Sequence, residues 1–292
     1  MKKELIGILS ILLLLFPSYT IMSYSSSQQR NSCQCVAFRL DDVQDHYLAK
    51  VNMQIMKVFQ EKNASLNLGI VGDLFGQDER LVSFIRDQMN NKNPELAVSN
   101  HGWNHEDFRR LSKDNQSLLI KATNKKINES LGVRPSVFIA PFDVFNNDTL
   151  IALKENGLKY ISSIIYYDPG PIGILEDAMP YHFPSTATTS DDNGTYWIGI
   201  PHQNTSTQIE NSILKYGFAV VEMHPYEYST KHDYSYKPFN ITDVRGTFSY
   251  RDFIKNWDKA RIDWMQIREL ELLIDEVRDQ GYKIVPIEKL IS

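Results

Sequence analysis

The sequence predicts an α/β protein built on a parallel sheet. Strand-like and helix-like segments alternate over about 250 residues without a linker-like break, a pattern typical of strands covered by helices. The chain has 292 residues, of which 42% are hydrophobic and 11% aromatic, so it can bury a sizeable core. The net charge of −5 and the lack of a long basic run argue against a nucleic-acid partner. Periodicity alone does not decide between a barrel and an open sheet.

Hydrophobic spacing predicts each element in order. Short apolar runs bounded by turn residues predict the strands, and apolar residues three or four positions apart predict the helices. The expected strands are 36–40, 65–71, 95–99, 136–140, 159–165, 218–223 and 282–286. The expected helices are 48–62, 79–91, 112–131, 148–156, 207–215 and 263–280, three of them followed by Gly132, Gly157 and Gly281. Two long irregular segments, 166–206 and 225–249, are too large for simple connectors and suggest a functional rim.

The first residues resemble a targeting segment. Lys2 and Lys3 precede an apolar run, Leu5–Phe16, which at about 18 Å is shorter than a ~30 Å bilayer core. We expect residues 1–25 to be a signal peptide or an uncleaved N-terminal anchor, 26–35 a polar tether, and 36–292 a single domain. Both interpretations predict a secreted or extracellular protein, with membrane contact only through the N-terminal segment if it is uncleaved.

Two further patterns bear on export. The acceptor pattern N-x-[ST] begins at seven positions, whereas chance gives about 2.5, so we expect a glycoprotein, although an Asn-rich composition is the alternative. Cys33 and Cys35 are one residue apart. A bridge between them would close a very tight ring, so two thiols or an intermolecular contact are favoured over a local metal site.

Ionisable residues follow three of the predicted strands. Asp41 and Asp42 come directly after one strand, and adjacent buried carboxylates need a metal, a cationic partner or a role as a helix cap. His101 and His105 follow another strand, and their spacing would put both imidazoles on one side of a helical turn, as Zn²⁺ requires. His224 follows a third strand. If the sheet closes into a barrel, these five side chains converge on one face.

The order of these motifs resembles the polysaccharide deacetylases of carbohydrate esterase family 4, which contain the NodB homology domain. The matching segments are Phe38–Asp42, Leu66–Gly72, Asn100–His105, Ala140–Phe142, Val220–His224 and Gly281–Pro286. The resemblance implies a distorted seven-stranded (β/α)7 barrel with long loops on its active face. It also implies a carbohydrate substrate from which N-acetyl groups are removed, with acetate and a free amine as products.

The resemblance further implies roles for individual residues. Asp42, His101 and His105 would hold Zn²⁺ or another divalent transition metal. Asp41 would be the general base, His224 the acid that protonates the leaving amine, and the backbone N–H of Phe142 an oxyanion donor. Substrate contacts are expected from Pro141, Trp103 and Tyr226, and further candidates are Trp197, Tyr228 and His202.

The sequence also departs from the family pattern. The third motif usually carries an Arg that orients the catalytic Asp, and here that position is Ile139; Arg39 is a weak substitute, since it alternates away from Asp42. The last motif usually has Leu where this chain has Glu222, and an Asp-Trp motif is not recognisable near Tyr166–Asp168. A hydrolase of another amide or ester, or a non-catalytic glycan-binding surface protein, therefore stays open as an alternative.

Overall fold

The computed structural model describes residues 33–45, 47–90, 93–164, 180–192, 197–230 and 261–290. The predicted leader, residue 46 and parts of both long irregular segments lie outside these ranges. Among the described residues, no helix combines the length and apolar character needed to cross a membrane.

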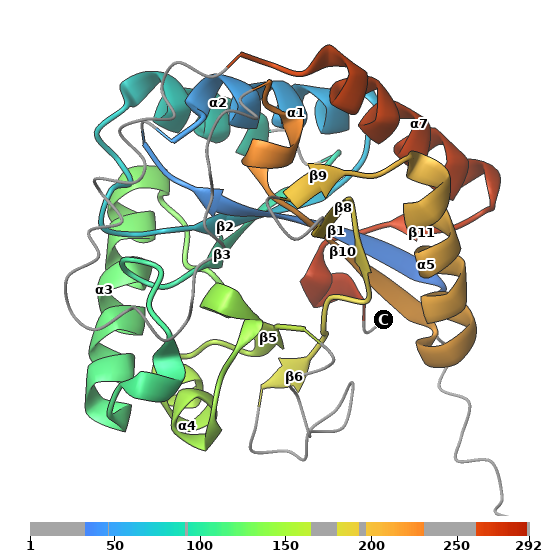
Figure 1. Ribbon diagram of the computed structural model, residues 1–292. Coiled ribbons are helices and arrows are strands. Elements are labelled where there is room, and N and C mark those ends of the chain that lie inside the picture. Colours follow the sequence, from blue (N-terminus) through green and yellow to red (C-terminus); the bar gives the residue numbers. More distant parts are fainter. Residues whose placement is uncertain are drawn as a thin grey trace, which may run out of the picture. The chain divides into compact units, whose positions relative to one another are not determined.

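Strands and helices alternate along the described chain as the sequence predicts (Figure 1). The strands are β1 Cys35–Val43, β2 Leu66–Ile70, β3 Leu96–Asn100, β4 Val137–Ile139, β5 Tyr160–Ser162, β6 Tyr181–His182, β7 Ala187–Thr188, β8 Ser190–Asp192, β9 Trp197–Gly199, β10 Phe218–Met223 and β11 Lys283–Ile284. The α-helices are α1 Ala49–Glu61, α2 Glu79–Met89, α3 Lys113–Leu131, α4 Asn147–Glu155, α5 His202–Tyr216 and α7 Trp264–Asp279. Short 3₁₀ turns are η1 Phe108–Arg110, η2 Pro141–Asp143, η4 Pro225–Tyr228 and η6 Ile287–Lys289.

The main sheet is parallel and curls into a distorted barrel, which confirms the predicted fold. Its strand order is β6-β5-β4-β3-β2-β1-β10-β7, and β11 adds to the start of β1. Its two edge strands, β6 and β7, belong to one stretch of chain, 181–188, which pairs with β5 at one end and with β10 at the other. An additional bridge joins Ile164 to Ser185 within that stretch. This segment therefore connects the two edges of the sheet, in the place of a regular seventh strand.

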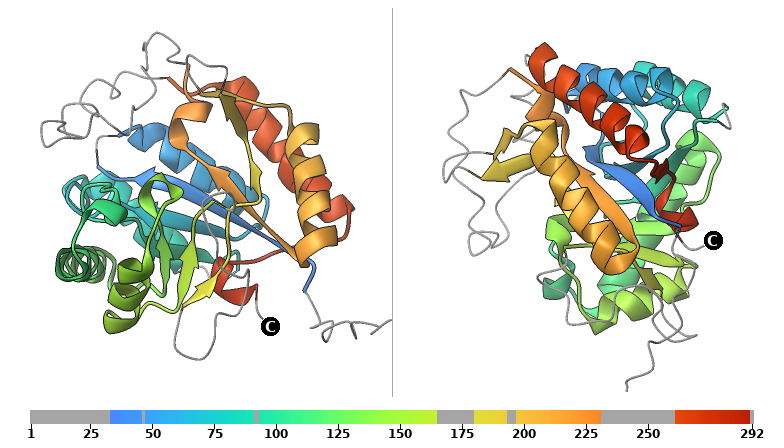
Figure 2. Two further views of the ribbon diagram at one scale, coloured as in Figure 1. Left: turned by 60° about the horizontal axis from the view of Figure 1, so that its bottom comes forward. Right: turned by 90° about the vertical axis from the view of Figure 1, so that its right-hand side faces the viewer.

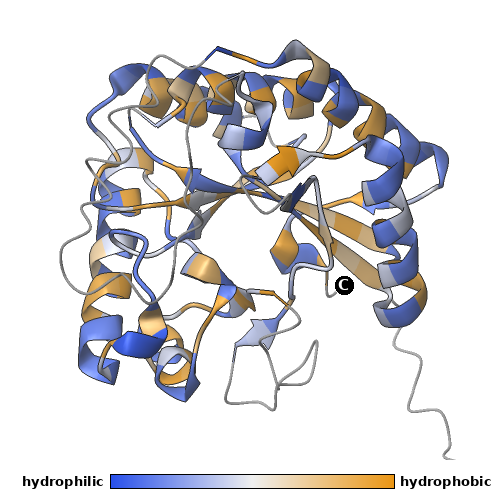
Figure 3. Cartoon of the chain, in the orientation of Figure 1, coloured by the Kyte–Doolittle hydropathy of each residue, from blue (hydrophilic) through white to orange (hydrophobic). Residues whose placement is uncertain are grey.

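Helices cover the outside of the sheet, as the two views in Figure 2 show. Side chains of β1 alternate between two environments: Val36, Phe38 and Leu40 join the core beneath the helices, whereas Ala37 packs in the barrel interior. In Figure 3 the outer helices carry both hydrophilic and hydrophobic residues, as amphipathic helices on a barrel should. Arg39 and Asp41 continue the inward-facing series of Ala37, because strand side chains alternate with a period of two.

Several local signals fix the helix ends. Asp78, Ser112 and Asp263 accept backbone N–H hydrogen bonds as N-caps of α2, α3 and α7. Gly132 ends α3 in the left-handed conformation, with φ of 75°. Capping therefore agrees with the predicted starts and ends of these helices within one or two residues.

Three structural expectations are wrong. The helix expected at 207–215 begins at His202, because Pro201 starts it without a side-chain cap. The segment 166–206, expected to be irregular, contributes four short strands from its described part, and two of these join the main sheet. Cys33 and Cys35 form a disulfide, with Cα atoms 5.1 Å apart, where two thiols or an intermolecular contact were expected.

Candidate active site

The end of β1 carries both adjacent aspartates into the barrel mouth. The pairing of β1 with β2 shifts register between Leu40 and Val43, and Asp42 adopts a positive φ of 62°. This irregularity interrupts the alternation that would otherwise place Asp41 and Asp42 on opposite faces. The N-cap of α1 is Leu48, so helix capping does not account for the two carboxylates.

Asp42, His101 and His105 come together as the resemblance implies. Their ligand atoms lie within 4.8 Å of one another, and Asp42 Oδ1 is 3.5 Å from His101 Nε2 and 3.3 Å from His105 Nε2. Within the described part of the chain, neither Asp42 Oδ1 nor His101 Nε2 has a hydrogen-bond partner, although both atoms are buried. Two buried polar atoms that face each other without donor or acceptor partners are what an Asp/His metal site presents before the ion binds.

The protein fixes the tautomer of His101. Its Nδ1 lies 2.9 Å from the carbonyl oxygen of Ile139, which can only accept, so Nδ1 carries the proton and Nε2 presents its lone pair. Burial lowers the pKa of His105 to about 4, which keeps this imidazole neutral at ordinary pH. Burial would raise the pKa of Asp42, but the two neighbouring histidines hold it below its usual range. Asp42 and His105 therefore favour the protonation states that metal ligands need. Burial would lower the pKa of His101, but the carboxylates of Asp42 and Asp41 raise it, so a bound cation would have to displace a proton from this imidazole.

The two histidines do not share a helical turn, contrary to the sequence expectation. Residues 101–105 form a non-helical loop in which Gly102 and His105 have φ values of 76° and 56°. The Glu106 carboxylate accepts hydrogen bonds from the backbone N–H groups of Trp103 and Asn104 and so holds this loop in shape. The left-handed residues of this loop, and not a helical turn, direct the His105 imidazole towards Asp42.

One glycine that the motif search passed over makes room for the site. A Cβ on Gly69 of β2 would lie 3.3 Å from Asp41 Oδ1 and 3.4 Å from the Cβ of His101. A Cβ at this position would be in tight contact with Asp41 and in ordinary contact with His101, so Asp41 would have to shift by a few tenths of an ångström. Glycine therefore lets the neighbouring strands approach closely here.

Asp41 and His224 lie beside the metal-ligand group. Ligand atoms of Asp41, Glu222 and His224 lie within 4.8 Å of one another and form a second Asp/Glu/His cluster. Asp41 is 2% exposed, and burial raises its pKa against the opposing charge of Arg39. Arg39 and the protonated His224 supply two positive charges beside Asp41 and Glu222, so the charges of this second cluster balance without an ion.

Glu227 is a site residue that no sequence motif identifies. Its carboxylate is 3.3 Å from His224 Nδ1 and accepts hydrogen bonds from Thr189 Oγ1 at 2.5 Å and Ser190 Oγ at 2.8 Å. Burial would lower the pKa of His224, but the contact with Glu227 and the charge of Glu222 raise it to about 10. His224 is therefore protonated at neutral pH, and the contact of its Nδ1 with Glu227 orients the ring.

The expected substrate residues have different environments. Tyr226 stacks on His224, with ring centroids 5.1 Å apart and an interplanar angle of 23°. Phe142 has a φ of 57° and its ring packs against His105 at 4.4 Å, while Pro141 is buried beside Gly102. Trp103 lies half-buried next to Gly72. The contacts of these residues with a substrate stay predictions.

The remaining aromatic candidates divide by exposure. Trp197 on β9 is 42% exposed and could offer a stacking face. Tyr228 is only 2% exposed, so the expectation that it forms a sugar-stacking surface is wrong.

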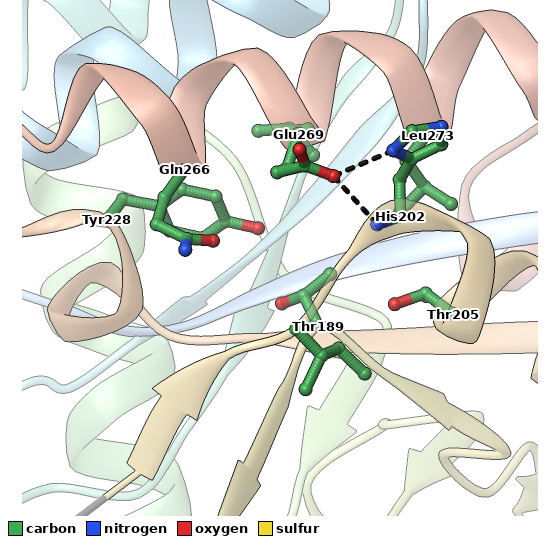
Figure 4. Close-up of a pocket in the computed structure, with 9 residues that line it drawn as sticks. Thr189, His202, Thr205, Tyr228, Gln266, Glu269 and Leu273 are labelled. Atoms are coloured by element: carbon green, nitrogen blue, oxygen red, sulfur yellow. Dashed lines mark hydrogen bonds and ion pairs between the residues drawn. The ribbon is translucent and has the colours of Figure 1, made fainter.

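His202 lies in a separate small pocket between α5 and α7 (Figure 4). Its Nδ1 and its backbone N–H both contact the Glu269 carboxylate, at 2.7 Å and 2.9 Å. None of the residues lining this pocket belongs to the Asp/His clusters. His202 therefore links two helices and has a structural role.

Comparisons with known proteins agree with this geometry. The sequence profile of the polysaccharide deacetylase family matches residues 28–161, which include Asp41, Asp42, His101, His105 and Phe142. Over this segment the chain is similar to the polysaccharide deacetylase family. No curated protein matches the chain significantly. The family match ends before β10, so it does not include His224 or Glu227.

Solved structures extend the likeness to the whole fold. A putative polysaccharide deacetylase from Mycobacterium smegmatis has a TM-score of 0.59 and 18% identity, with 91% of each chain covered. A family 4 acetyl xylan esterase from Clostridium thermocellum, in complex with a cobalt ion, has a TM-score of 0.53 and 14% identity, covering 88% of this chain and 89% of that one.

A CE4-family pseudoenzyme from Bacillus anthracis has a TM-score of 0.56 and 13% identity, covering 90% of this chain. This chain spans 66% of that protein's chain. At such identities these three structures support the fold and not a specific activity.

Proposed function

We propose that this protein is a metal-dependent hydrolase of the polysaccharide deacetylase family and that it removes N-acetyl groups from a glycan. The observation that carries the proposal is the buried, unpartnered pair of Asp42 Oδ1 and His101 Nε2, with His105 beside them. One carboxylate and two imidazoles with open positions are the donor set of a catalytic zinc site. Asp42, His101 and His105 would therefore hold the ion.

A divalent cation at this position supplies Lewis acidity to an acyl oxygen and makes a neighbouring water more acidic. The protein's own residues supply the proton transfers. Asp41 is placed to accept the proton of the attacking water, because one of its oxygens is held by Arg39 at 3.3 Å while Oδ1 has no hydrogen-bond partner among the described residues. A carboxylate whose pKa burial has raised is a better base than an exposed one.

His224 is placed to return a proton to the leaving nitrogen. Glu227 holds its Nδ1, so Nε2, which lies 3.7 Å from Glu222 Oε1, is the nitrogen proposed to donate the proton. The backbone N–H of Phe142, next to the His105 ring, is the proposed donor to the oxyanion that forms on the acyl carbon. Pro141, Trp103 and Tyr226 would shape the surface on which the sugar rests.

The test is acetate release from N-acetylated chito-oligosaccharides, with O-acetylated xylan and small acyl amides as parallel substrates. The proposal expects zinc-dependent acetate release from the N-acetylated glycan, which a chelator abolishes and added zinc restores. Release from the ester or small amide alone would favour another hydrolase on the same scaffold. Bound zinc without turnover of any substrate would contradict the catalytic proposal and favour a glycan-binding protein.

We also propose that the protein is exported and glycosylated. Five of its seven N-x-[ST] positions lie in the described residues, and all five asparagines are exposed: Asn63, Asn115, Asn128, Asn147 and Asn204. Mass spectrometry of tryptic peptides from the natural producer should find glycans on these asparagines and a mature N-terminus near residue 25. Unmodified acceptor peptides would contradict the glycosylation, and a chain retained in the cytosol would contradict the export.

A further inference from the structure

Arg39 is a fully buried cation in the barrel interior, with 0% exposure. Its guanidinium contacts the carboxylates of Asp143 at 2.5 Å, Glu222 at 2.8 Å and Asp41 at 3.3 Å, and donates to Ser162 Oγ at 3.0 Å. A buried charge is strongly destabilising unless its donors are paired, and here three carboxylates from different segments surround it. Arg39 therefore links β1, β5, β10 and the turn after β4.

Two departures from the family pattern meet at this guanidinium. Ile139 occupies the position where the third motif usually carries an Arg, and Glu222 occupies the position where the last motif usually carries Leu. Glu222 is the direct neighbour of Arg39 in the β1–β10 register, and Ile139 is the direct neighbour of Ser162 in the β4–β5 register. The Arg39 side chain thus extends from β1, and its guanidinium lies near β4, the strand that carries Ile139 in place of the arginine.

Positions 39 and 139 both face the barrel interior, so an arginine at either position can reach the same place. Val137 and Ile139 of β4 pack with Ala37 of β1 in the interior cluster, so position 139 faces the same interior as position 39. Arg39 also lies two residues before Asp41, on the same face of β1. The contact of Arg39 is with Asp41, and not with Asp42, against which the sequence analysis weighed it.

We propose that Arg39 is the positioning residue for Asp41, and that the pair Arg39–Glu222 replaces the arginine that position 139 lacks. This inference rests on the proposed deacetylase function. The Nε contact holds Asp41 Oδ2, which leaves Oδ1 without a hydrogen-bond partner among the described residues, and it keeps the carboxylate from turning towards the cation site of the adjacent Asp42. Glu222 shares the guanidinium charge and fixes its plane.

The first experiment compares wild type with Arg39→Met, which keeps most of the side-chain volume but removes the charge and the forked N–H donors of the guanidinium. Arg80→Met, at an exposed arginine of α2, is the matched control. Loss of positioning should lower kcat by about 100-fold, with KM within about threefold and zinc content unchanged. Arg39→Lys should recover only part of kcat, because an ammonium cannot bridge several carboxylates as a fork. A kcat for Arg39→Met equal to that of the Arg80→Met control would overturn the proposal.

The second experiment moves the arginine. The triple variant Arg39→Thr, Glu222→Leu, Ile139→Arg places the arginine at the third-motif position and leaves no unpaired Glu222. It should regain at least about tenfold in kcat over Arg39→Met, or over Arg39→Thr with Glu222→Leu if Arg39→Met does not fold. A folded triple variant, verified by its thermal transition, that shows no such gain would contradict the exchange.

Crystal structures of zinc-loaded wild type and Arg39→Met give a readout that needs no turnover. The Asp41 carboxylate should rotate away from its wild-type orientation in the variant. If wild type releases acetate from no substrate, the proposed function fails, and the Asp41 orientation alone then decides the role of Arg39. An unchanged carboxylate in the variant would overturn that role.

Discussion

Replacing Asp41 by Asn removes the proposed general base while it keeps the shape of the side chain. Asp41 is 2% exposed, and one of its oxygens faces Arg39 Nε at 3.3 Å. The amide oxygen of Asn can keep that contact, so the fold and the zinc content should not change. General-base catalysis contributes about 100- to 10,000-fold, or about 3–5.5 kcal/mol of transition-state stabilisation. We therefore expect kcat to fall within this range at an unchanged KM.

The assay is continuous acetate release at saturating substrate, with bound zinc measured on the same samples. Asp275→Asn is the matched control, because the side chain of Asp275 is 45% exposed and pairs only with Lys62 among the described residues. A kcat for Asp41→Asn within about threefold of the control would refute the base assignment. Loss of zinc together with activity would show instead that Asp41 is a ligand.

Three further predictions concern the acid, the metal and the fold. The pKa of His224 is raised from 6.5 to about 10, so its folded-state stabilisation is complete below about pH 6.5 and is lost as the pH rises through about 10. Glu227→Gln should therefore move the alkaline limb of the kcat profile to lower pH, and an unmoved limb would contradict the role of Glu227. His101→Ala should abolish zinc binding in equilibrium dialysis while the chain still folds; full zinc occupancy would remove His101 from the ligand set. Asp263→Ala removes the N-cap of α7, which accepts from Met265 N at 2.9 Å, and should lower the unfolding free energy in urea by about 1 kcal/mol, whereas Asp263→Asn should not.

The sequence predicts most of this fold because its signals are local. Apolar periodicity and caps such as Asp78 and Gly132 specify the main helices within one or two residues. The segment 181–188 escaped prediction because its strands are two residues long and depend on pairing with β5 and β10, which are distant in sequence. Such pairing leaves no periodic pattern to detect.

The site was predictable in its members and only partly in its geometry. Strand ends in a parallel barrel converge, so Asp42, His101 and His105 could be grouped from their order alone. The left-handed conformations at Asp42 and His105, which actually aim two of these side chains, are tertiary features. The sequence therefore predicts the ligand residues His101 and His105 but not the non-helical backbone between them.

Arg39 and Glu227 show the limit of reading motifs one at a time. Strand alternation places Arg39 and Asp42 on opposite faces, so the sequence alone makes Arg39 a weak substitute for the motif arginine. The β1–β10 register, however, pairs Arg39 with Glu222 and leaves Asp41 on the same face as Arg39. Glu227 belongs to a 3₁₀ turn directly after His224, and its partners Thr189 and Ser190 come from the segment expected to be irregular. Contacts of this kind become visible only once the sheet is closed.

Zinc anomalous diffraction from crystals of the wild-type protein tests the central claim most directly. The account predicts one strong peak within about 2.0–2.2 Å of Asp42 Oδ1, His101 Nε2 and His105 Nε2. It further predicts that the peak disappears in His101→Ala crystals grown in the same zinc concentration. A wild-type site without a peak, or a peak held by the Asp41, Glu222 and His224 cluster instead, would contradict it.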